Sequence, residues 1–259
     1  MTSPLTGTRL AVVLGNTTCR MALMDGTEPR AAFVMSHAEL MTEDASLARI
    51  RALCGGEEVE EAGLCSVVPK LESLIGNLLQ AAGITRLQAV RPAASSFFPT
   101  EYRSMDTLGA DRYCGVLAAR ERYGAPVIVV DCGTATTINV VDARGVFLGG
   151  AIAPGVETAL RALHERTAQL PFAEISKKDV PLIGGDTGES LRSGALHFNR
   201  YALEGMVAEM KKHIGDKTPL ILTGGNAPVL LAAGLRCAPQ VFDAELLFRG
   251  IIFHLLFRG

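Results

Sequence analysis

The chain has 259 residues, of which 48% are hydrophobic and 20% charged, so it is apolar enough to fill a folded core and too apolar for a disordered chain. Its 25 Lys and Arg residues against 27 Asp and Glu residues leave a formal net charge of −2, which argues against nucleic acid or an anionic membrane surface as a partner. No apolar run approaches a membrane span, and the six cysteines form no CxxC pair, so we expect a cytoplasmic protein with free, buried thiols.

The N-terminal residues predict two strands joined by a glycine turn. Residues 10–14 are apolar and stop at Gly15-Asn16-Thr17, and a second apolar run over 21–24 ends at the turn signal Asp25-Gly26. The first run is too short for the apolar segment of a signal peptide, so it predicts a strand. The next patterns predict a strand over 64–68 and helices over 71–82 and 109–123.

The opening pattern returns later in the chain. Residues 127–130 form an apolar strand, followed by an Asp-x-Gly-Thr turn and a second strand. Gly15 then falls on Gly133, an offset of 118 residues, which indicates a duplicated domain rather than a short-period repeat. The repeat therefore predicts a two-domain α/β protein with a cleft between its halves. The remaining expected strands are 147–153 and 220–222, and the remaining expected helices are 157–169, 190–212, a segment ending at 231, and 245–257.

Three predicted turns have the form of a phosphate-binding turn, in which an apolar strand meets glycines and small polar residues. Glycine lets the backbone approach a ligand, and its bare amide groups bind phosphate oxygens. An Asp at the end of a buried strand is placed to hold a cation beside those phosphates. Each turn alone is also explained as a plain hairpin, but three in a duplicated frame favour a nucleotide cleft. The turns are Gly15-Asn16-Thr17, Asp131-Cys132-Gly133-Thr134 and Thr223-Gly224-Gly225, and no P-loop or Rossmann motif accompanies them.

An ordered set of short motifs resembles the type III pantothenate kinase family. Each motif is weak alone, but together they run in consistent order from residue 10 to about residue 255. The motifs are GADR (109–112), DCGTATT (131–137), GGAIAPG (149–155), IGGDT (183–187) and TGG (223–225), with SVVP (66–69), Tyr102 and HERTAQLP (164–171) fitting the same pattern.

The resemblance implies the fold of the actin, sugar-kinase and heat-shock ATPase superfamily, in which two duplicated ribonuclease-H-like domains hold ATP between them. We expect these domains over residues 1–117 and 118–259. The implied reaction transfers the γ-phosphate of ATP to the hydroxyl of pantothenate, giving 4′-phosphopantothenate in the first step of coenzyme A biosynthesis. The implied cofactors are Mg²⁺ and a monovalent cation, K⁺ or NH₄⁺, and the expected assembly is a homodimer with the acceptor site near the subunit interface.

The resemblance also implies site residues, position by position. Asp111 matches the catalytic base, a role that suits a carboxylate able to accept the proton of the acceptor hydroxyl. Asp131 matches the ligand of the monovalent cation. Standing alone, Asp111 and Arg112 are better explained as an ion pair or cap at a helix N-terminus, and Asp131 is also explained as a turn-forming residue. The matched pantothenate contacts are Tyr102, Gly109, Ala110, Arg112 and Thr187, and the matched ATP contacts are Gly15, Asn16, Thr17, Arg20 and Thr134.

One departure concerns the first turn, where the family has a strand running into Asp-x-Gly-Asn-Thr. This chain has VVLGNT, so Val13 stands in place of the Asp, opposite Asp131 in the internal repeat. An apolar side chain cannot ligate Mg²⁺ or orient its water shell. Arg20 is expected to neutralise part of the phosphate charge, and Asp25 or Asp106 is the alternative source of a displaced carboxylate.

Three functions follow from this pattern. The first is an active pantothenate kinase with weakened or altered metal use. The second is a catalytically impaired homologue retained as a binding or regulatory protein, which would bind pantothenate without turnover. The third is a kinase of a different small hydroxyl substrate, against which the intact GADR motif and Thr187 argue.

Overall fold

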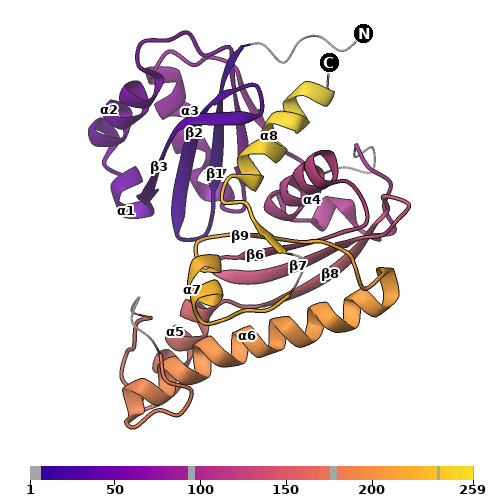
Figure 1. The fold of residues 1–259 in the computed structure, drawn as a ribbon. Helices are drawn as coiled ribbons and strands as arrows, with labels where there is room; N and C mark the ends of the chain where they lie inside the picture. Colours follow the sequence, from indigo (N-terminus) through magenta and orange to yellow (C-terminus); the bar gives the residue numbers. More distant parts are fainter. Residues whose placement is uncertain (1–6, 93–96, 176–179, 238–239, 259) are drawn as a thin grey trace. The chain divides into compact units, whose positions relative to one another are not determined.

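The computed structural model describes residues 7–92, 97–175, 180–237 and 240–258 (Figure 1). The chain forms two compact units, one of Met1–Arg122 with Glu245–Gly259 and the other of Tyr123–Ala244. The predicted domains, 1–117 and 118–259, differ from this division mainly at the C-terminus, because the last segment groups with the first unit. Within the described ranges, no helix is long and apolar enough to cross a membrane.

The first unit is built on a five-stranded sheet in the order β3-β2-β1-β4-β5. The central strand β1 pairs antiparallel with β2 and parallel with β4. Three helices, α1–α3, bury apolar residues against one face of this sheet. The elements are β1 (Thr8–Leu14), β2 (Thr18–Asp25), β3 (Glu28–Ser36), β4 (Glu61–Ser66), β5 (Leu87–Ala89), α1 (His37–Leu40), α2 (Glu43–Cys54), α3 (Glu72–Ala81) and α4 (Ala110–Tyr123).

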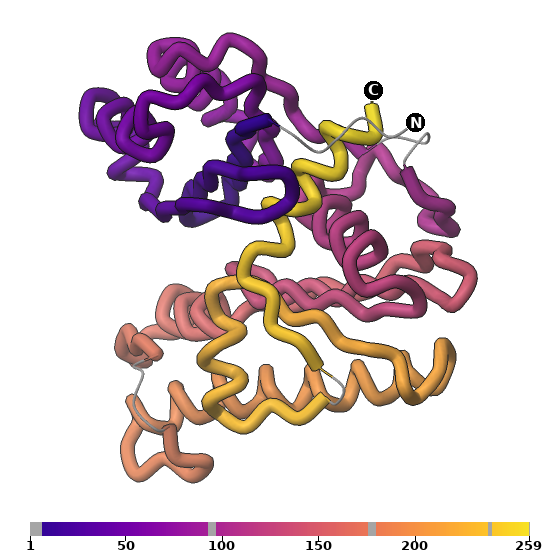
Figure 2. The backbone as a smooth tube through the Cα atoms, turned by 45° about the horizontal axis from the view of Figure 1, so that its top comes forward, coloured from indigo at the N-terminus to yellow at the C-terminus, as the bar shows by residue number. Residues whose placement is uncertain are grey.

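The last helix of the chain, α8 (Leu246–Phe257), covers the other face of the first sheet (Figure 2). It lies against β1 and β4, where a Cβ atom at Gly63 would come within 2.2 Å of Ile251 Cγ2. A Cβ atom at Gly250 on α8 would come within 2.1 Å of the carbonyl oxygen of Cys114 on α4. Glycines at these two contacts let α8 approach both the sheet and α4 closely. This helix is therefore part of the core of the first unit, although it is the last element in the sequence.

The second unit repeats the arrangement of the first, with a sheet in the order β10-β9-β6-β7-β8. Its central strand β6 pairs antiparallel with β7 and parallel with β9, as β1 does with β2 and β4. Helices α5, α6 and α7 share one apolar core with this sheet. The elements are β6 (Val127–Cys132), β7 (Ala135–Val141), β8 (Phe147–Pro154), β9 (Leu220–Thr223), β10 (Gln240–Phe242), α5 (Val156–Arg166), α6 (Thr187–Ile214) and α7 (Ala227–Ala232).

The predicted strands and helices all correspond to observed elements, and the α/β class and the duplication are confirmed. The strand expected over 64–68 instead begins at Glu61 and ends at Ser66. Strand β3 was missed because it is an exposed edge strand with Pro29 near its start. All six cysteines are free and buried, as expected. The other α-helices and strands without a prediction are α1, α2, β5 and β10.

Candidate active site

The first glycine turn, Gly15-Asn16-Thr17, connects the central strand β1 to β2. The Gly15 N–H donates to the Thr18 carbonyl oxygen at 3.0 Å, which closes the turn. The Gly15 carbonyl oxygen accepts a hydrogen bond from the Nε2–H of His37, at the start of α1, over 2.9 Å. Asn16 and Thr17 are exposed. The turn therefore presents two exposed residues while a side chain from another element holds its glycine.

Position 13 offers no oxygen ligand for a metal ion. Val13 is 8% exposed and pairs with Arg20 across β2 and with Cys65 across β4. The Arg20 guanidinium lies 4.9 Å from the ring centroid of Phe248, on α8, in a cation–π contact. A guanidinium and a thiol beside an apolar side chain do not fit a divalent cation, which prefers oxygen ligands. The side chains at this position would therefore not bind Mg²⁺.

The second glycine turn, residues 133–134, has one residue fewer than the first and is held from two sides. The Gly133 N–H donates to the Ala135 carbonyl at 3.1 Å. On one side, Asn226 at the start of α7 donates its Nδ2 proton to the Gly133 carbonyl at 3.2 Å. On the other side, a Cβ atom at Gly155, which precedes α5, would come within 2.2 Å of the same carbonyl oxygen. The N-termini of α5 and α7 thus lie beside the turn, an arrangement that suits phosphate.

Asp131 stands on β6 between two threonines. It pairs with Thr137 on β7 and with Thr223 on β9, and residues paired in this way point to the same face of a sheet. The Thr223 hydroxyl is buried and has no hydrogen-bond partner in the described part of the chain. A carboxylate with two hydroxyl oxygens beside it fits a hard cation. Gly224 is required here, because a Cβ atom on it would lie 2.3 Å from Asp131 Oδ1.

Asp111 lies in the first turn of α4, and its side chain turns back towards the start of the helix. Its Oδ1 accepts the Arg112 backbone N–H at 2.7 Å. A Cβ atom at Gly109 would be 2.4 Å from the same oxygen, so the glycine of GADR makes room for the carboxylate. Burial raises the pKa of the Asp111 carboxyl, and the N–H and charge of Arg112 offset only part of that rise. A carboxylate with a raised pKa is a stronger base than an ordinary Asp.

Arg112 and Tyr102 form a second pair beside Asp111. Arg112 is only 7% exposed, and its guanidinium carbon lies 5.4 Å from the centroid of the Tyr102 ring. Its Nη1 donates to the Tyr102 hydroxyl oxygen at 3.4 Å. A buried guanidinium oriented by an aromatic ring suits recognition of a carboxylate.

The predicted residues fall into groups. Tyr102, Gly109, Ala110, Asp111 and Arg112 come together at the start of α4, and Asp131 and Thr134 come together at the second turn. Thr187 is the exposed first residue of α6, whose N-cap Asp186 accepts the Glu189 N–H at 2.7 Å.

One proposed source of a displaced carboxylate is ruled out. Asp25 pairs with Thr8, at the end of β1 away from the first turn, so the length of the strand, about 20 Å, separates it from that turn. Sequence reasoning assigned no role to His37 and Asn226, which hold the two turns through strand register and helix placement, although Asn226 directly follows the TGG motif. Thr137 and Gly155 end the DCGTATT and GGAIAPG motifs, and the structure places Thr137 beside Asp131 and Gly155 against the second turn.

Comparison with known proteins identifies close relatives. The family model for type III pantothenate kinase matches residues 9–209. Type III pantothenate kinase of Thermomicrobium roseum is 34% identical over 226 residues, covering 85% of this chain and 87% of that protein. The enzyme of Zymomonas mobilis is 35% identical over 250 residues, covering 93% of this chain and 90% of that protein.

Solved structures share the fold at lower sequence identity. A conserved putative Baf family transcriptional activator from Campylobacter jejuni matches with a TM-score of 0.58 and 17% identity, covering 96% of this chain and 97% of that one. A ROK family glucokinase from Streptomyces griseus, in complex with glucose and AMPPNP, matches with a TM-score of 0.54 and 14% identity, covering 98% of this chain and 100% of that one. These likenesses support the actin-like kinase fold.

Proposed function

The chain belongs to the type III pantothenate kinase family, and we propose that it phosphorylates pantothenate with ATP, using Asp111 as the general base. Transfer of the γ-phosphoryl group to the pantothenate hydroxyl gives 4′-phosphopantothenate, the first step towards coenzyme A. The observation that carries the proposal is the partly buried Asp111 carboxylate, which has a raised pKa and is held at the start of α4 next to Arg112.

Asp111 and the residues around it each have a separate role in binding pantothenate, the phosphoryl acceptor. Asp111 accepts the proton of the pantothenate hydroxyl as that oxygen attacks the γ-phosphorus, and the bond from the γ-phosphorus to the bridging oxygen of ADP breaks. Arg112 binds the pantothenate carboxylate, and the Tyr102 ring holds the guanidinium in place. Gly109, Ala110 and Thr187 are proposed as further contacts of pantothenate.

The glycine turns bind the nucleotide. In the turn formed by Gly15, Asn16 and Thr17, the backbone N–H of Asn16 donates to a phosphate oxygen, and Arg20 adds positive charge. In the second unit, Thr134 and the start of α5 do the same, because Gly155 brings that helix against the turn. Positioning and charge neutralisation supply most of the catalysis in phosphoryl transfer.

The two cations are held differently. Asp131, with the hydroxyls of Thr137 and Thr223 beside it, would hold K⁺ or NH₄⁺ near the phosphates. Mg²⁺ supplies charge neutralisation of the phosphates when bound. Since Val13 provides no ligand, we propose that phosphate oxygens and water hold this Mg²⁺ rather than a carboxylate of the first turn.

The second unit carries an apolar surface suited to homodimer formation. Large apolar side chains are exposed on the edge strand β8, on the segment before α6 and on α6 itself. Ile183 and Phe198 are 87% and 78% exposed, and Ile152 and Tyr201 are also exposed. Because exposed apolar patches of this kind mark protein–protein contacts, we propose that a second copy of the chain covers them. Analytical ultracentrifugation tests this, and a Phe198→Glu variant is expected to shift the dimer towards monomer.

Pantothenate-dependent release of ADP, measured with Mg²⁺ and K⁺ present, tests the proposed function. We expect turnover in the wild-type chain and a loss of about 10²–10⁴-fold in Asp111→Asn, whose amide keeps the shape but cannot act as a base. Absence of turnover in the wild type, with calorimetry still detecting pantothenate, would contradict the kinase and indicate a homologue retained for binding.

A further inference from the structure

We propose that His37 is a positioning residue for ATP, which aims the first glycine turn at the phosphates through the carbonyl of Gly15. Because the bond is to a carbonyl oxygen, Nε2 of His37 must be the donor, at a distance of 2.9 Å. This inference rests on the proposed function, since it assigns the first turn to the phosphates of the nucleotide.

The geometry of the peptide group explains how His37 acts on the ligand side of the turn. In a trans peptide, the carbonyl of Gly15 and the N–H of Asn16 lie in one plane and point in opposite directions. Holding the carbonyl towards His37 therefore holds the Asn16 N–H away from it. No acceptor in the described part of the chain takes this N–H, and Asn16 is exposed, so the group is free to donate to a phosphate oxygen.

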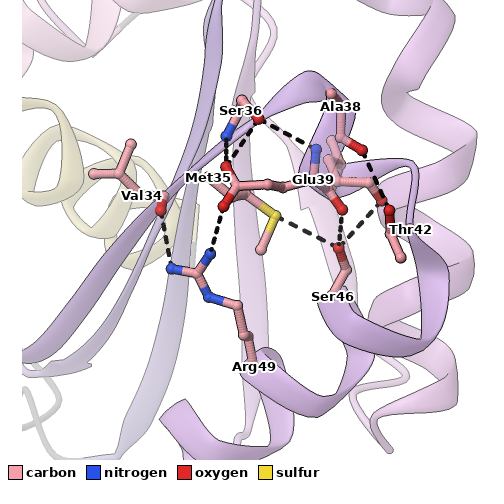
Figure 3. A network of polar contacts seen from close by, with 9 residues as sticks. Val34, Met35, Ser36, Ala38, Glu39, Thr42, Ser46 and Arg49 are labelled. Atoms are coloured by element: carbon pink, nitrogen blue, oxygen red, sulfur yellow. Dashed lines mark hydrogen bonds and ion pairs between the residues drawn. The ribbon is translucent and has the colours of Figure 1, made fainter.

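His37 can fix the turn because its own helix is held firmly (Figure 3). Strand β3 ends at Ser36, which pairs with Thr18 beside the turn, so α1 begins there. Ser36 and Glu39 cap α1 reciprocally: Ser36 Oγ accepts the Glu39 N–H at 3.2 Å, and the Ser36 N–H donates to Glu39 Oε2 at 2.6 Å. The buried Ser46 hydroxyl of α2 lies 3.0 Å from the Glu39 carbonyl and 3.2 Å from the Leu40 carbonyl.

Arg49 ties this network to the sheet. Its Nη2 donates to the Val34 carbonyl of β3 at 2.9 Å, and its Nη1 lies 3.5 Å from Glu39 Oε1 (Figure 3). The short helix α1 is thus attached at both ends, and these contacts fix the position of the His37 imidazole beside the turn.

In the second unit, a different side chain donates a hydrogen bond to the matching glycine carbonyl. Gly133 occupies the place of Gly15 in the internal repeat, and its carbonyl accepts the Nδ2 proton of Asn226 at 3.2 Å. The two donors come from unrelated elements, α1 and the start of α7. The same carbonyl is therefore held by a side chain in both halves of the duplication, which favours a role in the turn itself over an incidental contact. In the first unit this role matters more, because Val13 supplies no carboxylate.

The test compares His37→Leu, which removes the donor, with His37→Gln, whose amide N–H reaches the same distance from the backbone. The full chain is titrated with ATP and with adenosine by calorimetry, and KM is measured for ATP and for pantothenate. We expect His37→Leu to weaken ATP binding by about 5–10-fold, as for loss of one hydrogen bond, and His37→Gln to retain most of the affinity. Adenosine binding and the KM for pantothenate should change by less than about twofold, since the effect is confined to the phosphates.

His213→Leu, at an exposed histidine near the end of α6, is the matched control, and thermal unfolding verifies that each variant is folded. If His37→Leu does not fold, His37→Ala takes its place. Unchanged ATP affinity in the donor-free variant, or an equal loss with adenosine, or no rescue by glutamine, would overturn the inference. A wild-type chain that binds ATP but does not turn over would contradict the kinase and leave the calorimetric comparison intact; one that binds no ATP would overturn both.

Discussion

Val13 occupies the place in the first sheet that Asp131 occupies in the second. Each lies one residue before the end of the central strand, paired with the antiparallel neighbour on one side and the parallel neighbour on the other. The neighbours differ as much as the residues themselves, because Arg20 and Cys65 flank Val13 where Thr137 and Thr223 flank Asp131. The site around Asp131 in the second unit therefore suits a cation, whereas the matching position in the first unit already has the positive charge of Arg20 beside it.

Restoring a carboxylate with Val13→Asp is expected to raise phosphoryl transfer and to lower the Mg²⁺ concentration that gives half-maximal rate by about tenfold, because the new side chain is a hard oxygen ligand. The neighbouring Arg20 favours its ionised form. Steady-state kinetics over a Mg²⁺ series measures the effect, with Val13→Asn as the uncharged control. If neither the rate nor the metal dependence changes, the interpretation of position 13 is wrong.

The raised pKa of Asp111 predicts opposite effects of Asp111→Asn on activity and on stability. The folded chain holds this proton to higher pH than the unfolded chain does, so folding stability falls as pH rises from the unfolded pKa through the folded one. Asparagine has no charge, so it avoids the free-energy cost of burying an ionised carboxylate, and its side-chain oxygen still accepts the Arg112 N–H. Urea unfolding at pH 7 should therefore show a variant at least as stable as the wild type, and the difference should vanish below about pH 4. A clear loss of stability at pH 7 would contradict the pKa assignment.

Gly224→Ala is expected to damage the second turn. Gly224 has φ +92°, and an added Cβ would lie 2.3 Å from Asp131 Oδ1 and 2.6 Å from the Cys132 carbonyl carbon. Strain and displacement of Asp131 should cost about 1–3 kcal/mol of unfolding free energy and weaken K⁺-dependent activation. The neighbouring Gly225→Ala is the matched control for stability, because a Cβ there meets no atom within 4 Å. Equal unfolding midpoints for the two variants would refute the argument.

Glu28→Gln should loosen the attachment of α8 to the first unit. The Glu28 carboxylate lies 2.8 Å from Arg249 Nη2 on α8 and 2.7 Å from Arg122 Nη1 on α4. The hydrogen bond from Arg249, followed by that from Arg122, lowers the pKa of Glu28. Its stabilising effect is thus present above the unfolded pKa, near pH 4.3, and is lost as pH falls through the lowered folded value.

Because the Glu28 side chain is 55% exposed, we expect Glu28→Gln to cost at most about 1 kcal/mol at pH 7 and less at acid pH, measured by urea unfolding. Arg122→Gln breaks only the more exposed of the two pairs and should cost less, since Arg122 is 40% exposed and Arg249 only 8%. A pH-independent difference between Glu28→Gln and the wild type would exclude the ion pairs as its cause.

The sequence by itself determined the class of fold, the duplication and the motif residues, because these depend on local signals. Apolar runs that end in glycines predict strands and turns wherever they occur, and the GADR string predicts the start of a helix with a carboxylate at its second position. Even the absent carboxylate at Val13 was visible, since comparison with Asp131 needs only the spacing of two similar segments.

The tertiary structure alone decided which residues meet. The sequence grouped α8 with its neighbours along the chain, whereas Gly63 of β4 and the apolar side chains of α8 let this helix pack on the first sheet. Nothing local to His37 indicates that it holds Gly15, or that Arg20 stands beside Val13 over Phe248. Such contacts follow from strand register and helix packing between distant segments, which depend on how whole elements bury their apolar surfaces against one another.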